Sequence, residues 1–118
     1  VVDIQPDGDL MFDAGALWVA AKYQIPMLVV MHNNRAYYND WEHQIRMAKL
    51  RGTDEAKAHI GMDLFGPEPD LGALARAMGC YGEGPIDKPQ EVRPALLRAL
   101  AEVKEGRLAL VDTITQHR

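Results

Sequence analysis

The sequence predicts an α/β domain with an open, mostly parallel β-sheet and helices on both of its faces. Two nearly apolar runs, MLVVMH at 27–32 and RLALVDTIT at 107–115, have the composition of strands that are covered on both sides. Segments with helical periodicity lie between the strand-like runs, so strands and helices alternate along the chain. This alternation is typical of parallel strands joined by right-handed helical crossovers.

Length and composition limit the classes of protein to which the chain can belong. Its 118 residues fit one domain, and a hydrophobic content of 47% is too high for a disordered segment. No apolar run reaches the roughly 18–20 residues of a membrane-spanning helix. A net charge of -4 without a basic stripe argues against nucleic acid as the main partner. Cys80 is the only cysteine, which excludes an internal disulfide and favours a reducing, cytoplasmic location.

The two ends of the sequence suggest a piece of a longer chain. The sequence begins without Met, directly in a strand-like run, and it closes just after another such run. We therefore expect the domain at 1–118 to be partial, with further parts of the protein outside it.

The first half of the chain predicts a strand, a helix and a second strand. VVDIQ at 1–5 is rich in β-formers and is bounded by Pro6. Residues 13–23 read as a helix, with Asp13 as its N-cap and apolar positions on one side. The strand at 27–32 then stops at a pair of asparagines.

The second half is less regular at first and then alternates again. Residues 37–66 are polar and aromatic, and we expect a loop that passes into a helix. The remaining elements are, in order, a helix at 70–78 with Asp70 as cap and Gly79 as stop, a very short strand around Tyr81, an amphipathic helix at 89–104, and the last strand.

Polar residues follow the first two predicted strands where each strand ends. A helix of about 12 residues returns roughly 18 Å, and a strand of six residues advances roughly 20 Å, so the two lengths match. If the strands are neighbours, Asp7 and Asn34 face one point at the carboxyl edge of the sheet, where open α/β sheets bind ligands. Their oxygens suit Mg²⁺ shared with a phosphate, and the Gly8 amide could donate to an anion. The alternative is two surface turns, since Asp-Gly and Asn-Asn are common turn formers.

The stretch PDGDLMF…ALWVAAKYQIPMLVVMHNN resembles the cofactor-binding, C-terminal domain of thiamine diphosphate enzymes. The resemblance is to the branch of acetolactate synthase, benzoylformate decarboxylase and pyruvate decarboxylase. In that family the motif runs Gly-Asp-Gly and then, after a gap, Asn-Asn, in the order and spacing found here. PEPDLGALARAMG and RLALVDTIT are also similar to the end of that domain, so the resemblance covers nearly the whole chain.

The resemblance implies a set of site residues. Asp7, Asn34 and the backbone carbonyl of Ala36 match the family's magnesium ligands. Gly8, Asp9, Asn34, Ala36 and Tyr37 match positions that bind the cofactor.

Four positions depart from the family pattern. Pro6 stands where the first Gly is usual, Asp9 where a small hydroxyl residue is common, and Tyr38 where Gly often follows the pair. A carboxylate beside a diphosphate would be repelled, so we expect the Asp9 side chain to turn away and to cap the next turn. Acetolactate synthases carry a Gln-Trp pair soon after Asn-Asn, whereas here Trp41-Glu42 stands at a shifted position.

The family also implies what the whole enzyme does. It would act on a 2-oxo acid, with decarboxylation followed by protonation or by carboligation, as a homodimer or homotetramer. The glutamate that activates the cofactor lies on a separate pyrimidine-binding domain, which is absent here together with the middle domain that could carry FAD. The fragment alone is therefore expected to be inactive. The alternatives are a 2-oxo acid decarboxylase or acyl-coenzyme A lyase of the same fold, or a non-catalytic nucleotide-binding or assembly module.

The remaining polar candidates are weaker. We expect His32, at a strand end, to pack in the core or behind the site. Trp41 or His43 could line the substrate, because the family's counterpart of this segment covers the cofactor. His59 and His117 read as surface residues.

Overall fold

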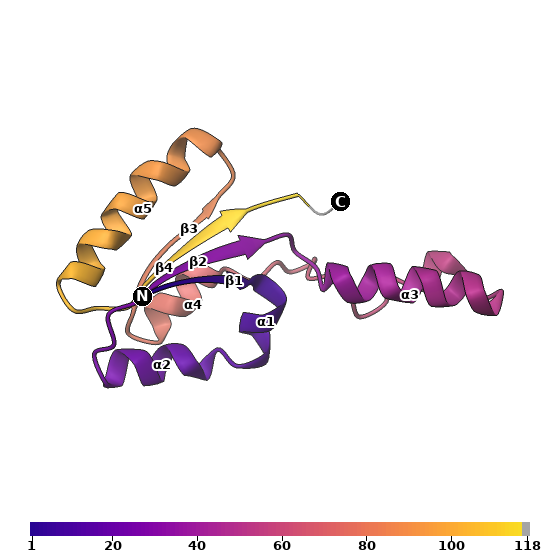
Figure 1. Cartoon of the computed structure of the whole chain (residues 1–118), viewed down its shortest axis with the longest axis horizontal. Helices are drawn as coiled ribbons and strands as arrows, with labels where there is room; N and C mark the ends of the chain where they lie inside the picture. Colours follow the sequence, from indigo (N-terminus) through magenta and orange to yellow (C-terminus); the bar gives the residue numbers. More distant parts are fainter. Residues whose placement is uncertain (117–118) are drawn as a thin grey trace.

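A computed structural model describes residues 1–116, so the expectation for His117 lies outside the described part. Within it the chain forms one four-stranded sheet in the order β1-β2-β4-β3, and every neighbouring pair is parallel (Figure 1). The strands are β1 (Val2–Pro6), β2 (Leu28–Asn33), β3 (Tyr81–Ile86) and β4 (Ala109–Ile114). The predicted α/β class with a parallel sheet is confirmed.

Helices connect the strands on both sides of the sheet (Figure 1). They are α1 (Asp7–Phe12), α2 (Gly15–Lys22), α3 (Tyr38–Arg51), the 3-10 turn η1 (Glu55–Lys57), α4 (Leu71–Ala77) and α5 (Pro89–Lys104). The clusters described below place α1, α2 and α4 on one face and α5 on the other. The expectation of helices on both faces is therefore confirmed.

The first two strands are direct neighbours, as the crossover length predicts. Val2 pairs with Leu28 and Pro6 pairs with His32, so both strands end at the same edge. The helical connection differs from the prediction, because it begins at Asp7 and breaks near Asp13. Asp13 does not cap the second helix; it ends α1, and Ala14 occupies the N-cap of α2.

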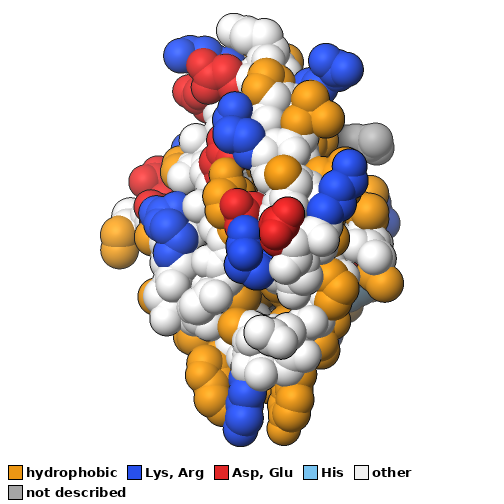
Figure 2. Space-filling model, turned by 90° about the vertical axis from the view of Figure 1, so that its left-hand side faces the viewer, with side chains coloured by type: hydrophobic (Ala, Val, Ile, Leu, Met, Phe, Trp, Pro, Cys, Tyr) orange, Lys and Arg blue, Asp and Glu red, His pale blue; other side chains and the backbone are white. Residues whose placement is uncertain are grey.

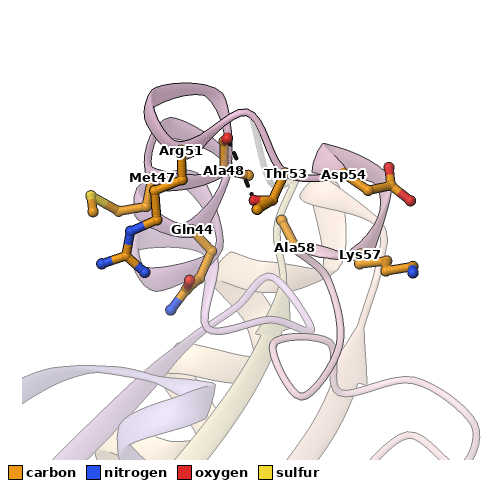
Figure 3. A pocket seen from close by; sticks show the side chains of 8 residues that line it. All are labelled: Gln44, Met47, Ala48, Arg51, Thr53, Asp54, Lys57 and Ala58. Atoms are coloured by element: carbon orange, nitrogen blue, oxygen red, sulfur yellow. Dashed lines mark hydrogen bonds between the residues drawn. The ribbon is translucent and has the colours of Figure 1, made fainter.

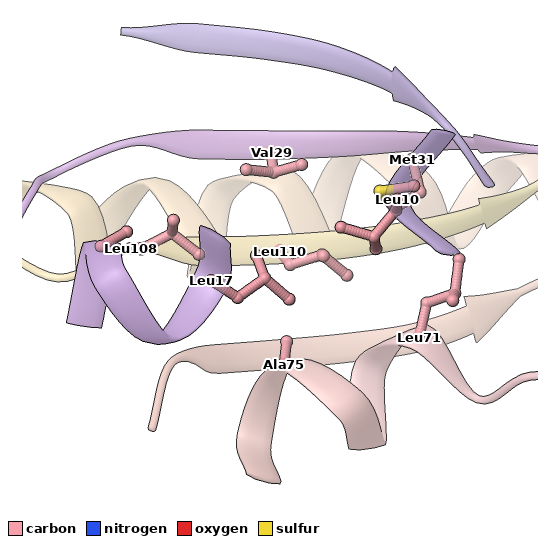
Figure 4. Close-up of a cluster of buried hydrophobic side chains, with 9 residues drawn as sticks. Leu10, Leu17, Val29, Met31, Leu71, Ala75, Leu108 and Leu110 are labelled. Carbon is pink, nitrogen blue, oxygen red and sulfur yellow. The ribbon is translucent and has the colours of Figure 1, made fainter. Parts of the chain in front are cut away.

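The larger core lies between the sheet and α1, α2 and α4 (Figure 4). Its side chains come from alternate positions of β2 and β4, which point to one face of a pleated sheet. Met31, Leu71 and Leu110 are fully buried in this cluster. The opposite face packs against α5, where Ala95 and Ala99 are fully buried beside Ala109 and Val111.

The second half of the chain follows its predicted elements closely. The Asp70 carboxylate accepts a hydrogen bond of 2.7 Å from the Ala73 N–H, and Gly79 adopts a left-handed φ of 84° after α4. Helix α4 lies very close to β3, because a β-carbon on Gly82 would come within 2.1 Å of the Gly72 carbonyl oxygen. Glycine at position 82 is therefore needed for this packing.

Helix α3 projects away from the sheet and gives the molecule its length of 55 Å (Figure 1). It packs on η1, and Ala48 is its only buried residue. The expectation of a loop that passes into a helix within 37–66 is wrong in its order, because the helix begins at Tyr38 and the irregular part follows it, with η1 as its one helical turn.

The surface carries charges of both signs. Figure 2 shows acidic and basic side chains intermingled over the upper part of the face that it presents. Among residues 1–116, no helix is long and apolar enough to cross a membrane.

Candidate functional site

Asp7 lies where β1 passes into α1, at the carboxyl edge of the sheet. Its side chain is 2% exposed, because the first turn of α1 folds back directly after the strand. Within the described part of the chain, neither of its carboxylate oxygens has a hydrogen-bond partner. A buried carboxylate without a partner is costly, and a bound cation would offset that cost.

Gly8 lies directly against an aromatic ring from the next strand's end. A β-carbon on Gly8 would come within 2.6 Å of two ring carbons of Tyr37. The Phe12 ring also packs near the Tyr37 ring, with the two ring centroids 5.4 Å apart. The contact between Gly8 and Tyr37 therefore joins the two polar ends of β1 and β2.

The two asparagines at the end of β2 form a tight turn. The Asn33 side-chain oxygen accepts a hydrogen bond of 3.1 Å from the Arg35 N–H, and the Asn34 side-chain oxygen accepts one of 3.0 Å from the Ala36 N–H. Arg35, which follows the two asparagines, has a left-handed φ of 59°. An amide oxygen has two lone pairs, so Asn34 keeps one for a further partner.

Ala36 is held by a short antiparallel bridge to Asp63. The Tyr37 N–H donates to the Met62 carbonyl at 2.8 Å, and the Leu64 N–H donates to the Arg35 carbonyl at 2.8 Å. Neither of these two hydrogen bonds uses the Ala36 carbonyl. The bridge therefore fixes the backbone around Ala36 without occupying that oxygen.

The predicted cofactor residues surround one cavity of about 280 Å³. Asp7 is not part of its lining; it is buried at the start of α1, next in sequence to the lining residues Pro6 and Gly8. The residues that line the cavity are Pro6, Gly8, Asp9, Asn34, Ala36, Tyr37, Tyr38, Asn39 and Asp40. The sequence-predicted residues Gly8, Asp9, Asn34, Ala36 and Tyr37 are thus brought together in three dimensions.

Asp9 is exposed and takes part in two cavities. It lines the cavity just described and also a second one beside Asp3 and Asp13. It does not cap α2, whose N-cap is Ala14 without a side-chain hydrogen bond.

The donor set suits a hard cation. An ionised carboxylate, an amide oxygen and a backbone carbonyl are the oxygen ligands that Mg²⁺ accepts, with the rest of its shell left to phosphate and water. Among residues 1–116, no three His, Cys, Asp or Glu side chains cluster as a metal site. The residues at this edge therefore fit a cation that is shared with a bound anion, rather than one enclosed by protein side chains alone.

Sequence reasoning missed a buried acidic residue behind the turn. Asp112 of β4 is 0% exposed and accepts a hydrogen bond of 3.0 Å from the Asn33 side-chain amide. Its other oxygen has no partner in the described residues. Burial is the main cause that raises its pKa from 3.8 to about 6, and the charges of Asp70 and Asp7 add to it. An aspartate in the apolar run LALVDTIT was the one signal that could have revealed it.

The structure also places His32, Trp41 and His43, which the sequence analysis considered as weaker candidates. His32 is exposed at the end of β2 and lies 3.4 Å from the Thr115 hydroxyl, so the expectation that it packs in the core was wrong. His32 shares the α5-side face of β2 with Leu28 and Val30, but it lies next to the end of the strand, where it is exposed. Trp41 lies on α3 with its ring 6.2 Å from that of His59, and His43 on the same helix is exposed.

A larger cavity of about 330 Å³ lies elsewhere, between α3 and η1 (Figure 3). Its lining includes Gln44, Arg51, Thr53 and Lys57, and the Thr53 hydroxyl donates to the Ala48 carbonyl. None of the predicted site residues lines it. Size alone therefore does not single out the functional cavity.

The sequence of this chain is similar to that of a known protein family and of a characterised enzyme. Over residues 1–113 the chain matches the family described as thiamine pyrophosphate enzyme, C-terminal TPP binding domain. It is 31% identical over 114 residues to acetolactate synthase isozyme 3 large subunit of Escherichia coli strain K12, covering 95% of this chain and 18% of that protein.

Two solved structures share the fold. Benzoylformate decarboxylase from Polynucleobacter necessarius has a TM-score of 0.71 at 23% identity, over 99% of this chain and 20% of that one. The thiamine diphosphate-dependent 4-hydroxybenzoylformate decarboxylase of Rhodococcus jostii RHA1 also has a TM-score of 0.71, at 22% identity and the same coverage. The chain spans about a fifth of the length of these relatives. The chain belongs to the family of C-terminal, thiamine pyrophosphate-binding domains of thiamine pyrophosphate enzymes.

Proposed function

We propose that this domain binds Mg²⁺ and the diphosphate of thiamine diphosphate in an acetolactate synthase-like enzyme that acts on 2-oxo acids. The observation that carries the proposal is the buried Asp7 carboxylate, which has no partner among the described residues. Asp7 lies at the same sheet edge as the turn that contains Asn34 and Ala36. A cation at this edge would give the carboxylate the partner that it lacks.

Each residue has a separate role in this proposal. Asp7, the Asn34 side-chain oxygen and the Ala36 carbonyl hold the cation, and Gly8 and the Asp9 N–H approach the diphosphate. Tyr37 closes the cavity from the side of β2, where its ring lies against Gly8. A side chain at position 8 would occupy space that the ring already fills, so glycine keeps the backbone accessible to the anion.

The domain contributes anchoring and orientation. Bound thiamine diphosphate supplies an electron sink for the decarboxylation of a 2-oxo acid, with or without carboligation. The residues described here hold its diphosphate end. The activating glutamate, the middle domain and any FAD belong to the parts of the protein outside residues 1–118.

We propose that the whole protein is a cytoplasmic homodimer or homotetramer. Exposed apolar side chains on α1, on α2 and directly after α2 support an oligomer: Phe12 is 79% exposed, Trp18 51% and Tyr23 66%. Large exposed apolar groups that lie together commonly mark an interface. The single cysteine is consistent with a reducing compartment.

Two alternatives share the same site. A decarboxylase or acyl-coenzyme A lyase would keep the anchor and differ in the residues above the cofactor, which include the α3 segment. A non-catalytic module would keep the fold without binding the cofactor. The similarity to acetolactate synthase and the fit of the donor set to Mg²⁺ favour the enzyme.

Isothermal titration calorimetry of the full-length enzyme with thiamine diphosphate and Mg²⁺ tests the proposal. Asp7→Ala and Asn34→Ala should each abolish Mg²⁺-dependent binding, because each removes one inner-sphere oxygen. Thr113→Val is the matched control, since it removes a hydroxyl from β4 that bonds to the Met31 carbonyl and leaves the site unchanged. Unchanged affinity in both site variants would reject the assignment.

A further inference from the structure

The turn at the end of β2 depends on a hydrogen-bonded pair that the proposed ligand set does not include. Asn33 is 4% exposed and Asp112 is 0% exposed, although both are polar. They come from adjacent strands and are joined at 3.0 Å between the Asn33 side-chain nitrogen and an Asp112 oxygen. Buried polar groups in such a position are costly unless they are hydrogen-bonded.

Asn33 connects Asp112 to the turn through two hydrogen bonds of its side chain. While its nitrogen donates to Asp112, its oxygen accepts from the Arg35 N–H at 3.1 Å. Arg35 has a φ of 59°, a conformation that costs energy for a residue with a β-carbon. The hydrogen bond from its N–H favours this conformation, and the Asn34 and Ala36 positions follow from it.

Asp112 also lies beside a closely packed part of the neighbouring strand β3. A β-carbon on Gly84 would come within 2.6 Å of the Asp112 carbonyl oxygen and 2.8 Å of its β-carbon, so β3 packs tightly on this part of β4. This close approach restricts the backbone from which the Asp112 side chain reaches Asn33. A rigid acceptor behind Asn33 gives the turn a fixed support.

From these contacts we propose that Asp112 and Asn33 are positioning residues, which set the backbone of residues 33–36 so that Asn34 and Ala36 face the cation. The proposal deepens the proposed function and rests on it. Asp112 does not touch the cation; it acts through Asn33. Partners of this kind around metal ligands typically change metal affinity by about 10–100-fold when they are removed.

The test is the affinity of the full-length apoenzyme for Mn²⁺ in the presence of thiamine diphosphate, measured by electron paramagnetic resonance. Asp112→Ala and Asn33→Ala should each weaken Mn²⁺ binding at least about tenfold. Asp112→Asn should keep affinity within about threefold of the wild type, because its amide oxygen still accepts from Asn33. Thr113→Val, on the same strand, should leave the affinity unchanged.

Asn33→Ser provides a second route if the alanine variants fail to fold. Serine can accept from the Arg35 N–H but cannot reach Asp112, so binding should be weaker than in the wild type and stronger than in Asn33→Ala. Wild-type affinity in Asp112→Ala or in Asn33→Ser would overturn the proposal. Loss in Asp112→Asn equal to that in Asp112→Ala would also overturn it, because a charge and not a hydrogen bond would then be responsible. Absence of Mn²⁺ binding in the wild type would instead contradict the proposed function.

Discussion

The ring of Tyr37 lies so close to Gly8 that a β-carbon at position 8 would come within 2.6 Å of it. Contacts this short require the ring or the backbone to move, at a cost of about 1–3 kcal/mol for an overpacked site. Gly8→Ala should therefore destabilise the turn between β1 and α1 and weaken cofactor binding about tenfold or more.

A double-mutant cycle with Tyr37→Ala checks this cause. Removal of the ring makes room for the added methyl group, so Gly8→Ala should cost less affinity in the Tyr37→Ala background than in the wild type. Calorimetry with thiamine diphosphate gives the four affinities. Equal costs in both backgrounds would show that the ring contact is not the reason for glycine.

Asp9 offers a charge test at the same cavity. Its carboxylate is exposed and lines the cavity that Gly8 and Asn34 also line. Asp9→Asn should strengthen diphosphate binding by about 2–5-fold at low ionic strength, and less at high salt, because a like charge is removed from a screened site. Titrations at two salt concentrations measure this. No change at either concentration would contradict this prediction and would support the expectation from the sequence that the carboxylate turns away from the anion.

Much of the fold could be predicted from the sequence because its signals are local. The apolar runs of β2 and β4, the Asp70 cap and the amphipathic α5 each depend on neighbouring residues. The convergence at the sheet edge also follows, since parallel strands of matched length must end together.

The features that the sequence did not predict have no local signal in it. Helix α1 has only six residues and starts at Asp-Gly, which reads as a turn. The contact between Asn33 and Asp112 joins residues 79 positions apart, and the sequence shows only an aspartate within an apolar strand. Exposure of His32 depends on how far the helix on its face of the sheet extends along β2, which the strand's own sequence does not reveal.

The free energy of unfolding of the domain should depend on pH through the titration of Asp112. Burial raises the pKa of this carboxyl from 3.8 to about 6, so the folded state favours the protonated form. The stabilisation is fully present below about pH 4 and is lost as the pH rises through about 6. Asp112→Asn stays neutral, and its stability relative to the wild type should therefore rise on the order of 2 kcal/mol between about pH 4 and pH 7.

Scanning calorimetry of the two full-length apoenzymes across this pH range measures that difference. The comparison of variants cancels the titration of other carboxylates, such as Glu83, whose pKa is lowered because Arg98 donates hydrogen bonds to it. A difference that does not depend on pH would show that Asp112 titrates as an ordinary carboxyl group.

The α3 segment should gain order when the cofactor and the remaining domains are present. Residues 37–66 project from the sheet, and apolar side chains there are exposed, with Leu50 at 80% and Ile60 at 66% (Figure 1). Few buried contacts offset an ordering entropy of roughly 1–2 kcal/mol per residue. Hydrogen exchange should show stronger protection of this segment in the full-length holoenzyme than in the isolated chain, and equal protection would contradict its role as a cover.

The ligand role of Asp7 is tested most directly by thermal unfolding of Asp7→Asn and the wild type as full-length enzymes, each with and without Mg²⁺ and thiamine diphosphate. Because the buried carboxylate has no partner among the described residues, the apo form of Asp7→Asn should be at least as stable as the wild-type apo form. The ligands should stabilise the wild type by about 2.7 kcal/mol at a hundredfold excess over Kd and stabilise the variant far less. Equal ligand-induced stabilisation of the two proteins would contradict the assignment of Asp7 to the cation.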